Sequence, residues 1–214
     1  MANRAYGQYC GFSRALEIVG ERWALLILRD LLTGPKRFSD LQRGLRGIPS
    51  NILTARLKEL EEAGVVERKA MARSAGAGVA YELTAKGREL EAPVIALGRW
   101  GATLLGEPRP GEIVTEDSMM MALRSTFRAE HAARTSARYE LRLGEIVIHA
   151  IVKNRSLSVG KGPIEKPDVV IESGPAIRAI MAQEITPEAA MKNKLVRITG
   201  DRELFARFAQ MFRI

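Results

Sequence analysis

The chain has 214 residues, of which 46% are hydrophobic and 27% charged, with a net charge of +8. This length suits one large or two small domains, and the apolar fraction is enough to form a core. A single cysteine excludes an internal disulfide and a multi-cysteine metal site, and the two distant histidines indicate no metal cluster. The sequence has no bilayer-length apolar run and no apolar signal core at its start. We therefore expect a cytosolic protein with no membrane partner.

The positive charge is concentrated in one stretch. Residues 36–73 contain nine Lys or Arg against five Asp or Glu, a surplus of four and half of the net +8. Residues 107–214 contain seventeen against fourteen and are close to balanced. A local cationic surplus fits a polyanionic partner, although it also fits an ordinary solvated surface.

The first half of the chain is expected to be mainly helical with one small hairpin. Glycines, a Thr-Gly-Pro stop and the 3.6-residue apolar period set the expected boundaries. The expected helices are 12–19, 23–32, 39–45, 49–63 and 84–105, and the expected strands are 65–71 and 80–83.

The helix expected at 49–63 has a distinct inner and outer face. Leu53, Leu57 and Leu60 are spaced at i, i+4 and i+7 and form one inward stripe. Small polar and charged residues, among them Asn51 and Thr54, then point outward. A helix enters the major groove of DNA when its outward N-terminal residues are small and polar, and nearby cations bind phosphates. A helix–turn–helix followed by a basic hairpin predicts a winged helix.

Residues 106–116 are expected to form a linker, because GEPRPGE at 106–112 combines two prolines with two glycines. The segment after it is predicted to be α+β, with a hairpin at Gly144. Its expected helices are 117–128, 130–134, 175–183, 186–191 and 201–214, and its expected strands are 139–143, 145–152, 157–159, 169–172 and 195–198. The domains predicted are therefore 1–105, mainly α, and 117–214, α+β.

Residues 10–100 resemble the HxlR family of bacterial transcription regulators, winged-helix relatives of the MarR group. The stretches that carry the resemblance are CGFSRALEIVGERWALLILRDLLTGPKRFSDLQRGLRGIPSNILTARLKELEEAGVVERK and YELTAKGRELEAPVIALGRWG. The resemblance implies a homodimer, built largely from helices flanking the winged core, that binds a pseudo-palindromic operator on double-stranded DNA. The implied base and phosphate contacts are Ser50, Asn51, Thr54 and Lys58. The implied backbone contacts are Lys36, Arg37, Arg68, Lys69 and Arg73, with Arg56 as a further candidate.

Two departures from the family pattern affect this interpretation. The recognition helix usually opens with Ser-Pro, whereas here Pro49 precedes Ser50, which can move the helix start by one residue. The first helix usually follows Cys-Pro, whereas here Cys10 is followed by Gly11. A cysteine at this place senses oxidants in some members of the family, and a helix N-terminus can lower a thiol pKa. The alternative for Cys10 is a small buried residue.

Residues 117–214 more loosely resemble sterol-carrier-protein-like domains, through the stretch DVVIESGPAIRAIMAQEITPEAAMKNKLVRITGDRELFARF. That resemblance implies a mixed sheet and helices around an apolar tunnel, and hence an apolar small-molecule effector. The alternative for its apolar stripes is ordinary core packing. The candidate lining residues are Met119, Met120, Met121, Phe205, Phe208, Met211 and Phe212.

The function expected is a DNA-binding transcription regulator, and a repressor in particular. No phosphate loop, nucleophile elbow or metal-ligand spacing is present, so neither an enzyme nor a cofactor is expected. A lipid or acyl-ligand carrier, whose basic first half serves dimerisation or membrane-surface contact, is the main alternative. A third interpretation makes the second half a dimerisation block.

Overall fold

The computed structural model describes residues 5–70 and 78–214, which form two compact units divided between Val94 and Ile95. The sequence predicts a division about ten residues later, after residue 105. The segment 95–105 belongs to the second unit because it is hydrogen-bonded there. Arg99 Nε donates to the Ser125 carbonyl at 2.8 Å, and Arg178 Nη1 donates to the Leu105 carbonyl at 3.4 Å.

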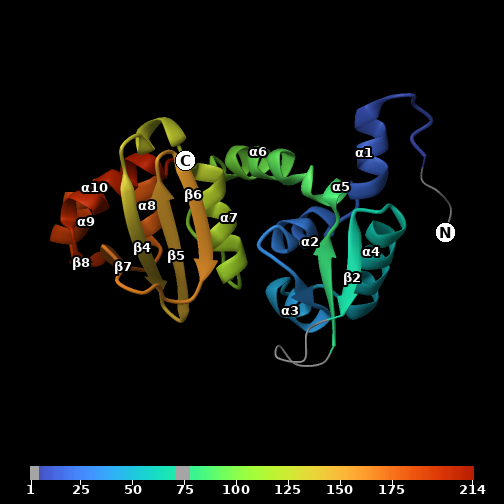
Figure 1. The fold of residues 1–214 in the computed structure, drawn as a ribbon, viewed down its shortest axis with the longest axis horizontal. Helices are drawn as coiled ribbons and strands as arrows, with labels where there is room; N and C mark the ends of the chain where they lie inside the picture. Colours follow the sequence, from blue (N-terminus) through green and yellow to red (C-terminus); the bar gives the residue numbers. More distant parts are fainter. Residues whose placement is uncertain (1–4, 71–77) are drawn as a thin grey trace. The chain divides into compact units, whose positions relative to one another are not determined.

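The first unit consists of helices packed around a small sheet (Figure 1). Its core joins the inward faces of the helices to the buried ends of the sheet strands, with Ile27, Leu28 and Leu41 fully buried. The helices are α1 (Gly11–Val19), α2 (Ala24–Leu31), α3 (Phe38–Gly44), α4 (Ser50–Glu62), α5 (Ala85–Arg88) and the start of α6 (Glu91–Ala102). The strands are β1 (Lys36–Arg37), β2 (Val66–Ala70) and β3 (Val79–Leu83), in the antiparallel order β1-β3-β2.

The sequence analysis did not predict β1, and it predicted one helix where the structure has α5 and α6. Thr84 caps α5 as expected, since its Oγ1 accepts from the Gly87 amide at 3.1 Å. Proline has no amide hydrogen, and its ring clashes with the carbonyl four residues earlier. Pro93 therefore prevents an unbroken helix through Glu89, and the chain instead restarts α6 with Pro93 in its first turn.

The second unit contains a five-stranded sheet with strand order β6-β5-β4-β7-β8. The β4–β7 pair is parallel and the other neighbours are antiparallel. The hairpin expected at Gly144 is confirmed: Leu143 pairs with Ile146, and Gly144 takes a positive φ of 60°. The strands are β4 (Ser136–Leu143), β5 (Ile146–Lys153), β6 (Ser156–Lys161), β7 (Val169–Ser173) and β8 (Val196–Gly200).

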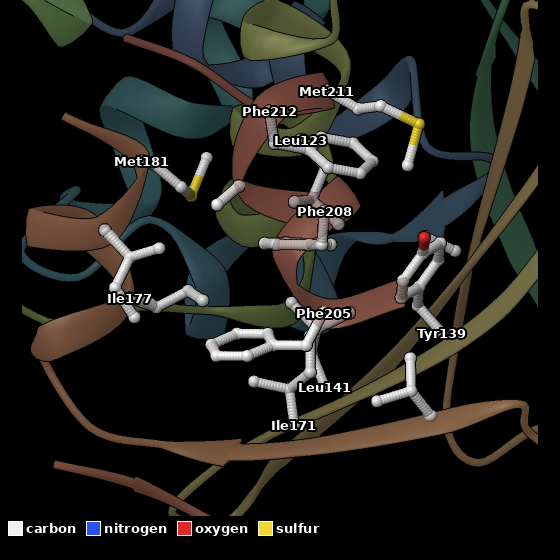
Figure 2. Packing of buried hydrophobic residues seen from close by; sticks show 14 of the residues in the cluster. Leu123, Tyr139, Leu141, Ile171, Ile177, Met181, Phe205, Phe208, Met211 and Phe212 are labelled. Carbon is white, nitrogen blue, oxygen red and sulfur yellow. The ribbon is translucent and has the colours of Figure 1, made fainter. Parts of the chain in front are cut away.

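The helices of the second unit pack against the sheet and enclose the larger of the two apolar cores (Figure 1). Figure 2 shows Phe205 and Phe208 of the last helix in one cluster with the strand residues Tyr139, Leu141 and Ile171. The segment expected as a helix at 130–134 is a short 3₁₀ turn at Ala129–Ala132. The α-helices are α7 (Glu116–Thr126), α8 (Ala176–Met181), α9 (Pro187–Lys192) and α10 (Arg202–Met211).

Residues after α10 complete this unit. Phe212 forms a bridge with Phe127, the Arg213 amide donates to the Thr126 carbonyl at 3.0 Å, and the Ile214 amide donates to the Met181 carbonyl at 2.9 Å. These bonds join the end of α7 to the end of α8. Across the residues that the structure describes, no helix is both long and apolar enough to cross a bilayer.

Candidate nucleic-acid interface

Helix α4 presents the outward face that its apolar spacing predicts. Leu53, Leu57 and Leu60 are all buried, and each is at most 1% exposed. The other side of the helix is exposed at four positions: Ser50, Asn51, Thr54 and Lys58. Pro49 is the N-cap, with extended φ and ψ, so the helix begins at Ser50. Small polar groups therefore occupy its first turn.

The local contacts of α4 leave this face open to a partner. Thr54 Oγ1 donates to the Ser50 carbonyl of its own helix at 2.9 Å. Lys58 Nζ lies 3.6 Å from Glu62 Oε1, and both side chains are well exposed. An exposed pair of this kind contributes little to stability, so a phosphate can replace Glu62 as the partner of Lys58.

The small sheet adds exposed cations beside α4, which packs against β2 (Figure 1). Arg68 pairs with Glu61 at 3.2 Å and lies over the ring of Tyr81, with its Cζ 5.7 Å from the ring centroid. Lys69 Nζ donates to Glu82 Oε1 at 2.8 Å, and this bond raises the pKa of Lys69 above its ordinary value. Both side chains are more than half exposed and remain cationic at neutral pH. Arg73, the remaining candidate of this hairpin, lies outside the described residues.

Lys36 and Arg37 differ in their access to solvent. Lys36 is only 7% exposed, because β1 places it in register with Tyr81 at the edge of the small sheet. This burial leaves Lys36 poorly placed for the phosphate contact expected from the sequence. Arg37 is half-buried at the N-cap of α3, and its Cζ would lie 3.9 Å from a Cβ built on Gly78.

Arg56 is held within the first unit. Its side chain is 16% exposed and forms ion pairs with Glu59 of α4 and, at 3.6 Å, with Glu21. These carboxylates occupy the guanidinium that the sequence analysis offered as a further DNA contact. We therefore assign Arg56 to packing between α4 and the segment before α2.

Two exposed arginines were not among the contacts predicted from the sequence. Arg43 lies in the last turn of α3 and Arg46 in the turn that leads to α4. The signal for them is present in the sequence, because residues 36–58 contain six Lys or Arg and one Asp or Glu.

Cys10 is exposed at the N-cap of α1. Hydrogen bonds from the backbone amides of Ser13 and Phe12 lower the pKa of the Cys10 thiol below its ordinary value. A thiol with a lowered pKa is more reactive at neutral pH, because the thiolate is the nucleophile. The expectation of a small buried residue does not describe Cys10.

The residues expected to line a ligand cavity lie in the interior of the second unit. All seven are buried, and six of them belong to its core cluster, with Met121 outside it. The ring centroids of Phe208 and Phe212 are 4.4 Å apart, and Tyr139 lies 5.5 Å from Phe208 (Figure 2). Ring contacts at these separations are those of packed aromatic side chains.

Family models match each unit of the chain. The HxlR-like helix-turn-helix model matches residues 18–108, and the SCP-2 sterol transfer family model matches residues 121–213. The uncharacterized HTH-type transcriptional regulator YvaP of Bacillus subtilis is 38% identical over 90 residues, which are 42% of this chain and 82% of that protein. The chain belongs to the HxlR-like helix-turn-helix family.

Other relatives of this HxlR-like protein are also named as regulators. An uncharacterized HTH-type transcriptional regulator of Mycobacterium tuberculosis is 44% identical over 110 residues. The match covers 51% of this chain and 66% of the mycobacterial protein, just under two thirds of its length. A crystal structure of the HTH-type transcriptional regulator ytcD is 37% identical, covers 44% of this chain and 96% of that one, and has a TM-score of 0.41. The SCP-2 match accounts for the second unit of the HxlR-like chain.

Proposed function

We propose that this HxlR-like protein is a transcriptional repressor that places α4 in the major groove of an operator. The observation that carries the proposal is the exposed polar face of Ser50, Asn51, Thr54 and Lys58, supported from behind by buried leucines. The major groove, about 12 Å wide, admits a helix, and asparagine can read adenine through two hydrogen bonds. Such a regulator acts on the chromosome, so we place it in the bacterial cytoplasm.

Backbone contacts come from exposed cations that flank α4. Lys58, Arg68 and Lys69 are each more than half exposed, and Arg37 lies beside the hairpin. Each cation that neutralises a phosphate releases a counterion, which increases affinity for any duplex and makes binding salt-dependent. These contacts orient the helix, whereas Ser50, Asn51 and Thr54 distinguish bases.

We further propose that the protein acts as a homodimer. Large apolar side chains are exposed along α1 and α6, including Phe12 at 72% and Trp100 at 64%. Tyr6 and Tyr9 precede α1, and Leu97 adds to the exposed apolar surface of α6. Soluble proteins rarely leave such side chains grouped in water, and a second copy would cover them. A twofold dimer would present two α4 helices to the two halves of a pseudo-palindrome.

The second unit is proposed to sense an apolar small molecule. The match to the SCP-2 family model and the size of its apolar core favour this role. An effector bound there would change the spacing of the two recognition helices. Half-sites centred about 34 Å apart tolerate little misplacement, so a small displacement would weaken operator binding.

The test is selection of bound sequences from a random duplex pool, followed by affinity measurements on the selected sequence with and without added fatty acids or sterols. A pseudo-palindromic sequence bound by a dimer supports the proposal, and release by an apolar ligand supports the sensing role. Binding without sequence preference, together with tight binding of acyl ligands, would instead favour the lipid-carrier alternative. A selected sequence whose affinity no apolar ligand alters would leave the second unit as a dimerisation block.

A further inference from the structure

The outward face of α3 and of the turn after it is polar and basic. Leu41 and Leu45 are buried, with exposed fractions of 0% and 3%. Exposed side chains recur on the other side at i, i+3, i+4 and i+7, the spacing of a single helix face. They are Ser39, Gln42, Arg43 and Arg46. This strip is defined by the same helix geometry that defines the outer face of α4.

The charge of the strip is positive with little local compensation. Asp40 is the only acidic residue between positions 36 and 58. Its Oδ2 accepts the Arg37 amide at 3.1 Å, and its Oδ1 lies 3.4 Å from Arg43 Nη2. The Arg43 side chain is 77% exposed, so this ion pair contributes little and can be exchanged for a stronger anion.

The turn places Arg46 close to the start of α4. Leu45 and Ile48 are both buried and anchor the turn, and the Ile48 amide donates to the Leu45 carbonyl at 3.0 Å. Gly47 has a φ of 87°, which allows the tight reversal between the two helices. Arg46 is exposed only four residues before Ser50. Its guanidinium is therefore carried at the end of α4 that presents the smallest polar residues.

We infer that Arg43 and Arg46 form a second phosphate-binding strip, which extends the DNA interface beyond α4 and the hairpin. The inference rests on the proposed function and adds two contacts to it. Guanidinium groups bind phosphate oxygens through paired hydrogen bonds, and solvated arginines retain the freedom to do so. Gln42 and Ser39, on the same face, add uncharged donors to the strip.

Other arginines of the first unit show by contrast what the strip requires. Arg29 Nη2 lies 2.7 Å from the carboxylate of Asp30, a buried residue, and the Arg29 side chain is only 23% exposed. Arg56 is similarly occupied by Glu59 and Glu21. Both are tied to acidic neighbours inside the unit, whereas Arg43 and Arg46 extend into solvent.

The experiment measures binding of a labelled random-sequence duplex by fluorescence anisotropy over a series of salt concentrations. The variants are Arg43→Ala, Arg46→Ala, the double variant, and Arg43→Lys/Arg46→Lys, which keeps the charge. Arg202→Ala, at an exposed position of α10, is the matched control for loss of one surface arginine. Thermal unfolding of each protein confirms that the variants are folded.

Each alanine substitution should reduce the slope of log K against log salt by about one unit, and the double variant by about two. The lysine variant should retain most of the slope, and Arg202→Ala should keep all of it. Binding by the unsubstituted protein with unchanged slopes in the alanine variants would overturn this inference alone. Equal losses in Arg202→Ala would overturn it too, since they would report only net charge. Absence of duplex binding by the unsubstituted protein would overturn the proposed function and this inference together.

Discussion

Gly98 of α6 lies so close to Ser125 of α7 that a Cβ atom on the glycine would be 2.6 Å from the Ser125 Oγ. The neighbouring Arg99 bonds the carbonyl of the same serine. The absence of a side chain at position 98 therefore allows the later part of α6 to pack on the second unit.

Gly98→Ala should lower the free energy of unfolding of the second unit relative to Gly101→Ala. Alanine is favoured over glycine within a helix by about 1 kcal/mol, and nothing lies within 4 Å of a Cβ at Gly101. At Gly98 the contact with buried Ser125 should cancel that gain and cost about 1 kcal/mol or more. Denaturant unfolding of the two variants measures the difference. Ser125→Ala removes the clashing oxygen, so a difference that persists in its presence would contradict this explanation.

Asn51→Ala and Lys58→Ala should separate base reading from phosphate binding. Asn51→Ala should reduce discrimination among duplexes by about 1–3 kcal/mol, because a bidentate base contact is lost. Lys58→Ala should weaken all sequences alike and reduce the salt slope by about one unit. Competition binding between the selected operator and single-base variants makes the comparison. Identical profiles for the two substitutions would show that α4 does not read bases through Asn51.

Arg56→Ala should affect stability rather than DNA binding. The substitution removes ion pairs to Glu59 and Glu21 from a mostly buried guanidinium and should cost about 1–2 kcal/mol of unfolding free energy. The salt slope for duplex binding should stay at the unsubstituted value. A reduced slope with unchanged stability would place Arg56 on the DNA interface after all.

Cys10 should ionise at a lower pH in the folded protein than in the unfolded chain. The Ser13 and Phe12 amides stabilise the thiolate, so the lowered pKa moves the midpoint of alkylation by iodoacetamide to lower pH. Since Cys10 is the single cysteine, mass spectrometry reports its modification without interference. The same titration in denaturant, where an ordinary thiol has a pKa of about 8.5, is the control. Coincident midpoints would remove the physical basis for a thiol switch.

The face of α4 could be predicted because it depends on local periodicity alone. Leu53, Leu57 and Leu60 determine the helix phase, and Asn51 and Lys58 are then necessarily on the other side. Arg56 could not be placed in this way. At 100° per residue it lies about 60° from the inward stripe, where the acidic neighbours decide its direction.

Other features depend on contacts between distant parts of the chain. β1 consists of only Lys36 and Arg37 and exists because β3 supplies its hydrogen-bonding partner, so a local pattern has no means of showing it or the burial of Lys36. The break between α5 and α6 is different. Pro93 signals it in the sequence, but the apolar period on both sides suggested one continuous helix.

The hydrogen bonds made by Arg213 and Ile214 have a consequence for biosynthesis. The first unit closes its core with residues that precede Ile95, so it can fold while the ribosome is still translating the rest of the chain. The second unit needs Phe212 in its interior and Ile214 against Met181 before its packing is complete. The DNA-binding half would therefore be formed before the half proposed to control it, leaving a brief interval in each newly made molecule without regulation.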